Sequence, residues 1–145
     1  MKKKHITVQS KDLARERLLK HGERVTPTRV AALAVLLDAH NALSHLEIAE
    51  LMHSTGEPSD RVTLYRVLDW LVEHDLAHKV AGEDRVWRFT TTTNQQHPHP
   101  HFHCIDCGKV MCLDAVHINS PRLPTGFTLA HMDTTIQGSC PDCNR

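Results

Sequence analysis

Four segments in the first half of the chain place apolar residues three or four positions apart, which is the spacing of an amphipathic helix. A residue that can accept hydrogen bonds from the first helical N–H groups precedes each segment. These predicted N-caps are Ser10, Thr26, Ser44 and Ser59, and Ser44 is followed by Glu47 in the pattern of a capping box. The sequence therefore predicts four helices before residue 76.

The fourth predicted helix carries two different faces. Its apolar stripe consists of Leu64, Val67, Leu68, Leu71 and Val72. Arg61, Tyr65 and Arg66 fall largely off that stripe, so the outer face is basic and aromatic. Such a face suits contact with nucleic acid, but the solvated surface of a helical bundle has the same pattern. The helix alone leaves both interpretations open.

Two short β-prone runs follow the helices. Leu76–Val80 and Arg85–Phe89 flank a turn at residues 82–84, which predicts a β-hairpin. Helices followed by a hairpin match a winged helix-turn-helix, in which the third helix supports, the fourth enters the major groove and the hairpin contacts the DNA backbone. A helical bundle with a terminal hairpin is the alternative. We predict a winged-helix domain over residues 1–89.

The second half of the chain has a different chemistry. Residues 90–100, TTTTNQQHPHP, are polar, contain proline and show no periodicity, which is typical of a linker or hinge. All five Cys and six of the thirteen His follow residue 95, whereas most charged residues precede it. We therefore expect residues 101–145 to form a separate, metal-binding domain.

Charge and hydropathy exclude several classes of protein. The 17 Lys and Arg balance the 17 Asp and Glu, so any nucleic-acid surface must be a local patch. No apolar run approaches the roughly 18 residues that span a bilayer, and no secretory signal is visible. We expect a cytoplasmic protein with no membrane partner. In that reducing compartment, clustered Cys and His indicate metal ligands before disulfides.

The strongest local motif consists of two Cys-x-x-Cys pairs. Cys104 and Cys107 form the first pair and Cys140 and Cys143 the second, and Gly108 allows a tight turn behind the first. Four thiolates form a tetrahedral set that is typical of structural zinc without an open coordination position. The alternatives are two unrelated thiol pairs and a redox dithiol. A redox dithiol is typical of a βαβ unit, and none is visible. We predict a structural zinc site.

A second metal site is predicted from a histidine tract. His97, His99, His101 and His103 alternate with other residues, so an extended chain places them on one face. The fifth cysteine, Cys112, lies in a short predicted strand that could return to this tract. A solvated His tract and a buried apolar Cys112 are the alternatives. Three other residues are weaker ligand candidates: His117, His131 and, at a helix end facing the linker, His40.

Motifs of catalysis are absent from the sequence. It contains no phosphate-binding Gly loop, no His-Glu-x-x-His helix, no nucleophile elbow and no zinc-deaminase pair. Only four acidic residues follow residue 95, and none has an evident acid–base partner. We therefore expect neither an enzyme nor a small-molecule substrate.

With these residues in place, the chain resembles the ferric uptake regulator (Fur) family of bacterial metal-responsive repressors. Four motifs carry the resemblance in the family's order: Arg24–Arg29 (RVTPTR), Arg61–Leu68 (RVTLYRVL), the His tract leading into Cys-x-x-Cys-Gly-Lys-Val, and Gly138–Cys143 (GSCPDC). The resemblance implies an α+β protein with an N-terminal winged helix-turn-helix domain and a small α/β dimerisation domain. It also implies a homodimer that binds a palindromic double-stranded operator when loaded with a sensing metal.

The resemblance also assigns roles to individual residues. Tyr65 and Arg66 match the major-groove contacts, and Arg24 matches a basic residue that reaches the DNA. With the outer face of the fourth helix, the residues expected at the DNA are Arg24, Arg61, Thr63, Tyr65 and Arg66. The expected regulatory metal ligands are His97, His99, His101 and Cys112, with His103, His117 and His131 as further candidates.

Departures from the family pattern bear on the sensing metal. The family's iron regulators carry carboxylates where this chain has Pro100, Arg88 and Cys112. Sulfur and nitrogen ligands suit zinc, whereas carboxylate-rich sites suit Fe(II) and Mn(II). We therefore expect a zinc-responsive repressor of metal uptake genes. The alternatives are an iron or peroxide sensor on the same scaffold and a zinc-ribbon module that does not sense. Pro121 and Pro124 further predict that the family's dimerisation helix is short or displaced.

Overall fold

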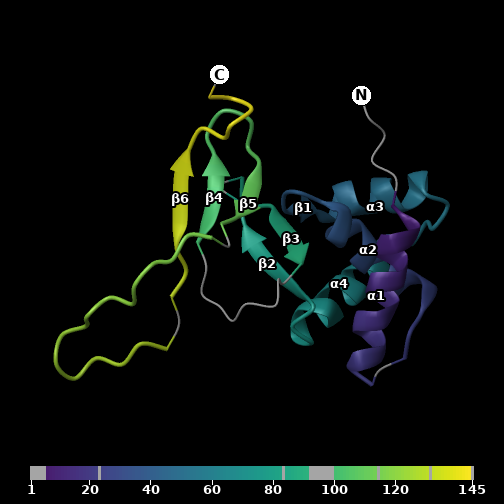
Figure 1. The fold of residues 1–145 in the computed structure, drawn as a ribbon, viewed down its shortest axis with the longest axis horizontal. Coiled ribbons are helices and arrows are strands. Elements are labelled where there is room, and N and C mark those ends of the chain that lie inside the picture. The colour runs from purple at the N-terminus through teal and green to yellow at the C-terminus, as the bar shows by residue number, and fades with distance from the viewer. Residues whose placement is uncertain are drawn as a thin grey trace. The chain divides into compact units, whose positions relative to one another are not determined.

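The computed structural model describes residues 6–22, 24–82, 84–91, 100–113, 115–130 and 132–144. The chain is an α+β protein that divides into two compact units, Met1–Thr92 and Thr93–Arg145 (Figure 1). Within the described ranges, no helix is both long and apolar enough to cross a bilayer.

Four helices make up most of the first unit, as the sequence predicts. They are α1 (Val8–Lys20), α2 (Pro27–Asp38), α3 (His45–Ser54) and α4 (Arg61–Glu73). Thr26 caps α2 as predicted, and Ser44 and Glu47 form both hydrogen bonds of the predicted capping box. Because the box satisfies two N–H groups that no helical carbonyl can reach, it fixes the start of α3.

Two predicted N-caps are wrong by one to three residues. Thr7, not Ser10, caps α1, and Ser10 lies inside the helix, where its hydroxyl donates to the carboxylate of Asp38 at the end of α2. Asp60, not Ser59, caps α4: its carboxylate accepts the N–H of Thr63 at 3.0 Å, and this bonding lowers the pKa of Asp60. A carboxylate is the better acceptor at the positive end of a helix.

The predicted hairpin belongs to a three-stranded antiparallel sheet. Its strands are β1 (Leu43–Ser44), β2 (Ala77–Ala81) and β3 (Trp87–Thr91), in the order β1-β3-β2. The two-residue β1 is too short to leave a periodic signal and was not predicted. Thr90 and Thr91, which the sequence placed in the linker, pair with β2. The side chain of Phe89 on β3 is buried in the apolar core that the helices form. We call the β2–β3 hairpin the wing.

The second unit contains a smaller sheet in the order β5-β4-β6. Its strands are β4 (His101–Cys104), β5 (Val110–Cys112) and β6 (Thr135–Gly138). Strand β5 runs antiparallel to β4, whereas β6 runs parallel to it. The predicted return of the Cys112 strand to the His tract is therefore confirmed.

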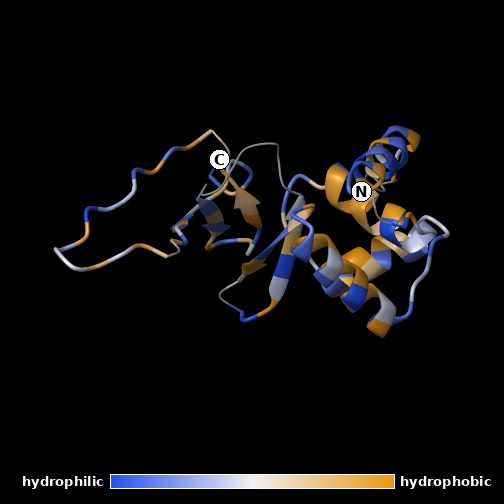
Figure 2. Cartoon of the chain, turned by 90° about the horizontal axis from the view of Figure 1, so that it is seen from below, coloured by the Kyte–Doolittle hydropathy of each residue, from blue (hydrophilic) through white to orange (hydrophobic). Residues whose placement is uncertain are grey.

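A long loop, residues 113–134, joins β5 to β6 (Figure 1). Its described residues, which are 113, 115–130 and 132–134, contain no helix, so the prediction of a short or displaced dimerisation helix is wrong for this part of the chain. Pro121 and Pro124 each remove a backbone donor within one would-be turn, which disfavours the helix that the family resemblance implied. Large apolar side chains are exposed along it, including Phe127 at 69% and Leu129 at 47%. Orange apolar segments alternate with blue ones along this loop (Figure 2).

Candidate metal centre and candidate nucleic-acid interface

The four paired cysteines converge at one end of the second unit. The Sγ atoms of Cys104, Cys107, Cys140 and Cys143 all lie within 4.8 Å of one another, and those of Cys107 and Cys140 are 3.8 Å apart. Tetrahedral zinc with Zn–S bonds of about 2.3 Å requires S···S separations of about 3.8 Å. The cysteine cluster therefore fits a zinc ion.

Two tight turns position these thiols. Behind the first pair, the N–H of Gly108 donates to the Cys104 carbonyl at 2.9 Å, and Gly108 has a φ of +74°, as predicted for this glycine. In the second, the N–H of Cys143 donates to the Cys140 carbonyl at 3.0 Å. Lys109 forms an ion pair with Asp142 at 3.2 Å, so side chains join the two turns as well.

Local electrostatics favour a bound cation. Backbone N–H groups of Cys107 and Cys140 bond to the sulfur of Cys104 and lower its pKa to about 6. The neighbouring thiols of Cys140 and Cys107 raise the pKa of Cys143 to about 12. The Cys104 thiol thus ionises readily, whereas the Cys143 thiol, which is bonded to neighbouring thiols, resists ionisation. A divalent cation removes that conflict.

Part of the predicted second site lies on one face of the smaller sheet. His101 pairs directly with Cys112, and His103 pairs with Val110. Directly opposite residues project to the same face with Cβ atoms about 4.5–5.5 Å apart, so His101 and Cys112 are within reach of one ion. Nε2 of His101 and most of His103 are buried.

The described residues place no further predicted ligand beside His101 and Cys112. His97, His99 and His131 fall outside the described residues, and His117 is exposed in the β5–β6 loop. His40 is exposed just beyond α2 in the first unit. Among the residues that the structure describes, only the four cysteines form a group of three or more ligands close enough to hold an ion.

The outer face of α4 carries the residues predicted to contact DNA. Arg61, Thr63, Tyr65 and Arg66 are all exposed, while Leu64, Val67, Leu68 and Leu71 are buried beneath them. The predicted division of α4 into an apolar and a basic, aromatic face is confirmed. Arg24 is exposed just before α2.

Two contacts on this surface were not predicted. The ring of His45 stacks on Tyr65, with centroids 3.8 Å apart and planes 17° apart. The guanidinium of Arg29 lies 3.8 Å from the ring centroid of Trp70, and its Nη1 donates to the Arg24 carbonyl at 2.6 Å. The His45–Tyr65 and Arg29–Trp70 contacts each join residues that are 20 or more positions apart in the chain, so no periodic signal predicts them.

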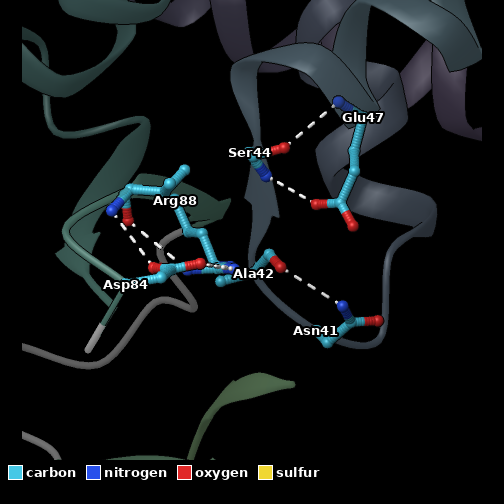
Figure 3. A network of polar contacts seen from close by, with 7 residues as sticks. Asn41, Ala42, Ser44, Glu47, Asp84 and Arg88 are labelled. Atoms are coloured by element: carbon cyan, nitrogen blue, oxygen red, sulfur yellow. Dashed lines mark hydrogen bonds and ion pairs between the residues drawn. The ribbon is translucent and has the colours of Figure 1, made fainter. Parts of the chain in front are cut away.

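The wing is braced by an ion pair. Arg88 donates to both carboxylate oxygens of Asp84 at 2.8 and 2.9 Å, which holds the pKa of Asp84 far below its usual range (Figure 3). Asp84, followed by Glu47, raises the pKa of Arg88, and β1 sets Ser44 opposite Arg88. Arg88 therefore serves as a structural cation within the wing.

Comparison with known proteins gives one family. The model of the ferric uptake regulator family matches residues 20–134. The zinc uptake regulation protein of Escherichia coli K12 is 27% identical over 124 residues, which cover 83% of this chain and 72% of that protein. The ferric uptake regulation protein of Klebsiella pneumoniae is 29% identical over 132 residues, covering 86% and 83%.

Solved structures show the same fold. A zinc uptake regulator in complex with zinc and DNA superimposes with a TM-score of 0.68 at 22% identity, covering 94% of this chain and 96% of that one. Because the family match spans well over half of the residues, the chain belongs to the ferric uptake regulator family, whose members are metal-responsive transcriptional regulators rather than enzymes.

Proposed function

We propose that this chain is a zinc-responsive transcriptional repressor that binds a palindromic operator as a homodimer and controls metal uptake genes. The observation that carries the proposal is the exposed basic and aromatic face of α4, next to the wing of a winged-helix unit. In this fold the corresponding helix enters the major groove. The chain's zero net charge makes such a local basic face the source of DNA affinity.

In this proposal, residues of the first unit divide the work of DNA recognition. Arg66 and Tyr65 contact base edges, and Arg61 and Thr63 contact DNA from the first turn of α4. Arg24 contacts a phosphate. An arginine that bonds a guanine through two donors contributes about 1–3 kcal/mol of discrimination, whereas a phosphate contact strengthens binding to every sequence alike.

The two metal sites have separate roles. The four-cysteine site has no coordination position left for a sensing exchange, so its zinc stabilises the second unit. His101 and Cys112, with His97 and His99, form the regulatory site. Imidazole and thiolate ligands favour zinc over Fe(II) and Mn(II). Residues 97–101 span the end of the predicted hinge, so a metal held there can bias the separation of the two DNA-binding domains in a dimer. Coupling of about 1.4 kcal/mol changes DNA affinity tenfold.

The dimer is supported by the β5–β6 loop. Val116, Leu123, Phe127 and Leu129 expose between 40% and 69% of their surface, and Arg122 is the one formally charged residue in 115–130. Exposed apolar side chains with so little charge are typical of a surface that is covered in an assembly.

A selection experiment tests the DNA-binding proposal. Zinc-loaded protein is allowed to select from a random duplex library, and we expect a two-fold symmetric consensus with half-sites about 34–36 Å or a multiple apart. Arg66→Ala should reduce the preference of the protein for the selected duplex over a shuffled duplex. Arg24→Ala should weaken binding to both duplexes. Repeating the selection with Fe(II) or Mn(II) separates a zinc regulator from an iron or manganese one. Equal losses on both duplexes for Arg66→Ala would assign Arg66 to the DNA backbone instead.

A further inference from the structure

Tyr65, the proposed base contact, is half-covered by another side chain. It exposes 40% of its surface, and it is the single tyrosine of the chain. The ring of His45 lies nearly parallel to it at 3.8 Å, which is the separation of a stacked pair. Both rings line a cleft of about 850 Å³ between α3, α4 and the wing. Tyr65 therefore remains accessible to a ligand while His45 stacks on one face of its ring.

His45 is itself fixed at two points. It is the first residue of α3, directly after the capping-box residue Ser44, so its backbone is set by the start of that helix. Its Nε2 lies 3.2 Å from the carbonyl oxygen of Arg61. Because a carbonyl only accepts hydrogen bonds, Nε2 carries the proton and donates. The helical pattern directs the N–H of Tyr65 to that same carbonyl, so His45 is tied to the helical turn that bears Tyr65.

A second group lies close to the same phenol ring. The guanidinium carbon of Arg61 is 5.7 Å from the Tyr65 centroid, within the range of a cation–π contact. A tyrosine held in this way has lost much of its rotamer freedom before DNA arrives. Ordering a side chain at an interface weakens binding by roughly 2- to 12-fold, so a pre-ordered Tyr65 avoids that loss.

We propose that His45 is a positioning residue for DNA sequence recognition: it holds the Tyr65 ring, through the stack and the bond to the Arg61 carbonyl, in the orientation that contacts the base edge. This inference rests on the proposed DNA-binding function. In this proposal His45 contacts Tyr65 and not the DNA. Its loss should therefore reduce discrimination between sequences more than it reduces general affinity.

The first test needs no DNA. Full-length, zinc-loaded protein labelled with 3-fluorotyrosine gives a single ¹⁹F resonance, because the chain has one tyrosine. His45→Ala should shift that resonance. His45→Phe, which keeps a stacked ring, should shift it less. The matched control is His53→Ala, which removes an exposed histidine from the other end of the same helix and should leave the resonance unchanged. An unmoved resonance in His45→Ala would overturn the stack.

The second test measures DNA binding of the same proteins. The probes are the duplex selected from the random library by the wild-type protein and a shuffled duplex of equal composition. We expect His45→Ala to lose about 2- to 12-fold in affinity for the selected duplex, with binding to the shuffled duplex unchanged. His45→Phe should recover most of the loss, and His53→Ala should match the wild type.

Two results in this assay would overturn the inference. Equal losses of His45→Ala on both duplexes, or no loss on either, would show that His45 does not position Tyr65 for recognition. If the wild-type protein itself shows no preference for any duplex, the proposed function fails and the positioning role fails with it. That case is recognised because the ¹⁹F shift of His45→Ala would persist without any sequence-specific binding.

Discussion

Arg29 shows how the helical unit holds Arg24, a proposed phosphate contact. Its guanidinium packs over Trp70 of α4 at 3.8 Å, and its Nη1 donates to the Arg24 carbonyl at 2.6 Å. Arg29→Met keeps an unbranched apolar stem but removes the guanidinium and with it the charge, the planar stack and the donor. This variant therefore isolates the contribution of the guanidinium.

The size of the effect follows from the two contacts. A cation–π contact near a surface contributes about 0.5–1 kcal/mol, and a hydrogen bond contributes about 0.5–1.5 kcal/mol. Arg29→Met should therefore lower the free energy of unfolding by about 1–2.5 kcal/mol. At about 4–8 °C per kcal/mol for a unit of this size, the thermal midpoint at 222 nm should fall by at least about 4 °C.

DNA binding should change as well, because the segment that carries Arg24 is released. Each lost phosphate contact reduces the slope of log K against log salt by about 0.9, so a dimer that loses two contacts changes by about 1.8. When the salt concentration rises from 50 to 200 mM, the ratio of the variant's affinity to the wild type's should therefore change by about tenfold. The slope is measured by fluorescence anisotropy on the selected duplex.

Arg29→Lys is the control for charge alone. Lysine keeps the positive charge but lacks the planar guanidinium that stacks and donates at a fixed angle. We expect it to lose most of the stability that Arg29→Met loses. If Arg29→Lys has the stability and the salt slope of the wild type, the guanidinium contacts are not needed, because a positive charge without stacking is then sufficient.

Two further predictions concern the metal centre and the wing. Cys143→Ser should lose the structural zinc and the fold of the second unit. Cys112→Ser, a matched thiol-to-hydroxyl change, should keep one zinc per chain by elemental analysis. An undiminished zinc content in Cys143→Ser would contradict the four-cysteine site. Asp84→Asn should lower the thermal midpoint at pH 7, because the ion pair with Arg88 depresses the pKa of Asp84 in the folded chain. That stabilisation is present above the unfolded pKa of about 3.9 and is lost as the pH falls. The difference in thermal midpoint between Asp84→Asn and the wild type should therefore be smaller at pH 3 than at pH 7. An equal difference at both pH values would contradict the role of the charge.

Elements with a strong local signal could be predicted from the sequence. The spacing of apolar residues in α4 defined both of its faces, and the spacing of the cysteine pairs, with Gly108, defined the zinc-binding turns. Local signals are less exact where two neighbouring residues can both cap a helix. Ser59 and Asp60 are adjacent and polar, and the structure shows the carboxylate of Asp60 accepting the N–H of Thr63.

Contacts between distant segments had no signal in the sequence. His45 resembled the other scattered histidines of the helical half, and its stack on Tyr65 arises only when α3 packs beside α4. Arg29 lay in a motif associated with DNA binding, yet its guanidinium faces Trp70. Such pairs depend on tertiary packing, which neither periodicity nor spacing encodes.

In the proposed function, zinc at the regulatory site controls DNA binding. The most direct measurement is a zinc titration of binding to the selected duplex, in a metal buffer, comparing the wild-type protein with Cys112→Ser. Both proteins should start with one zinc per chain and the same oligomeric state. We predict that zinc increases the affinity of the wild type at least tenfold, which corresponds to about 1.4 kcal/mol of coupling, and leaves Cys112→Ser unchanged. The same zinc response in both proteins would contradict the account.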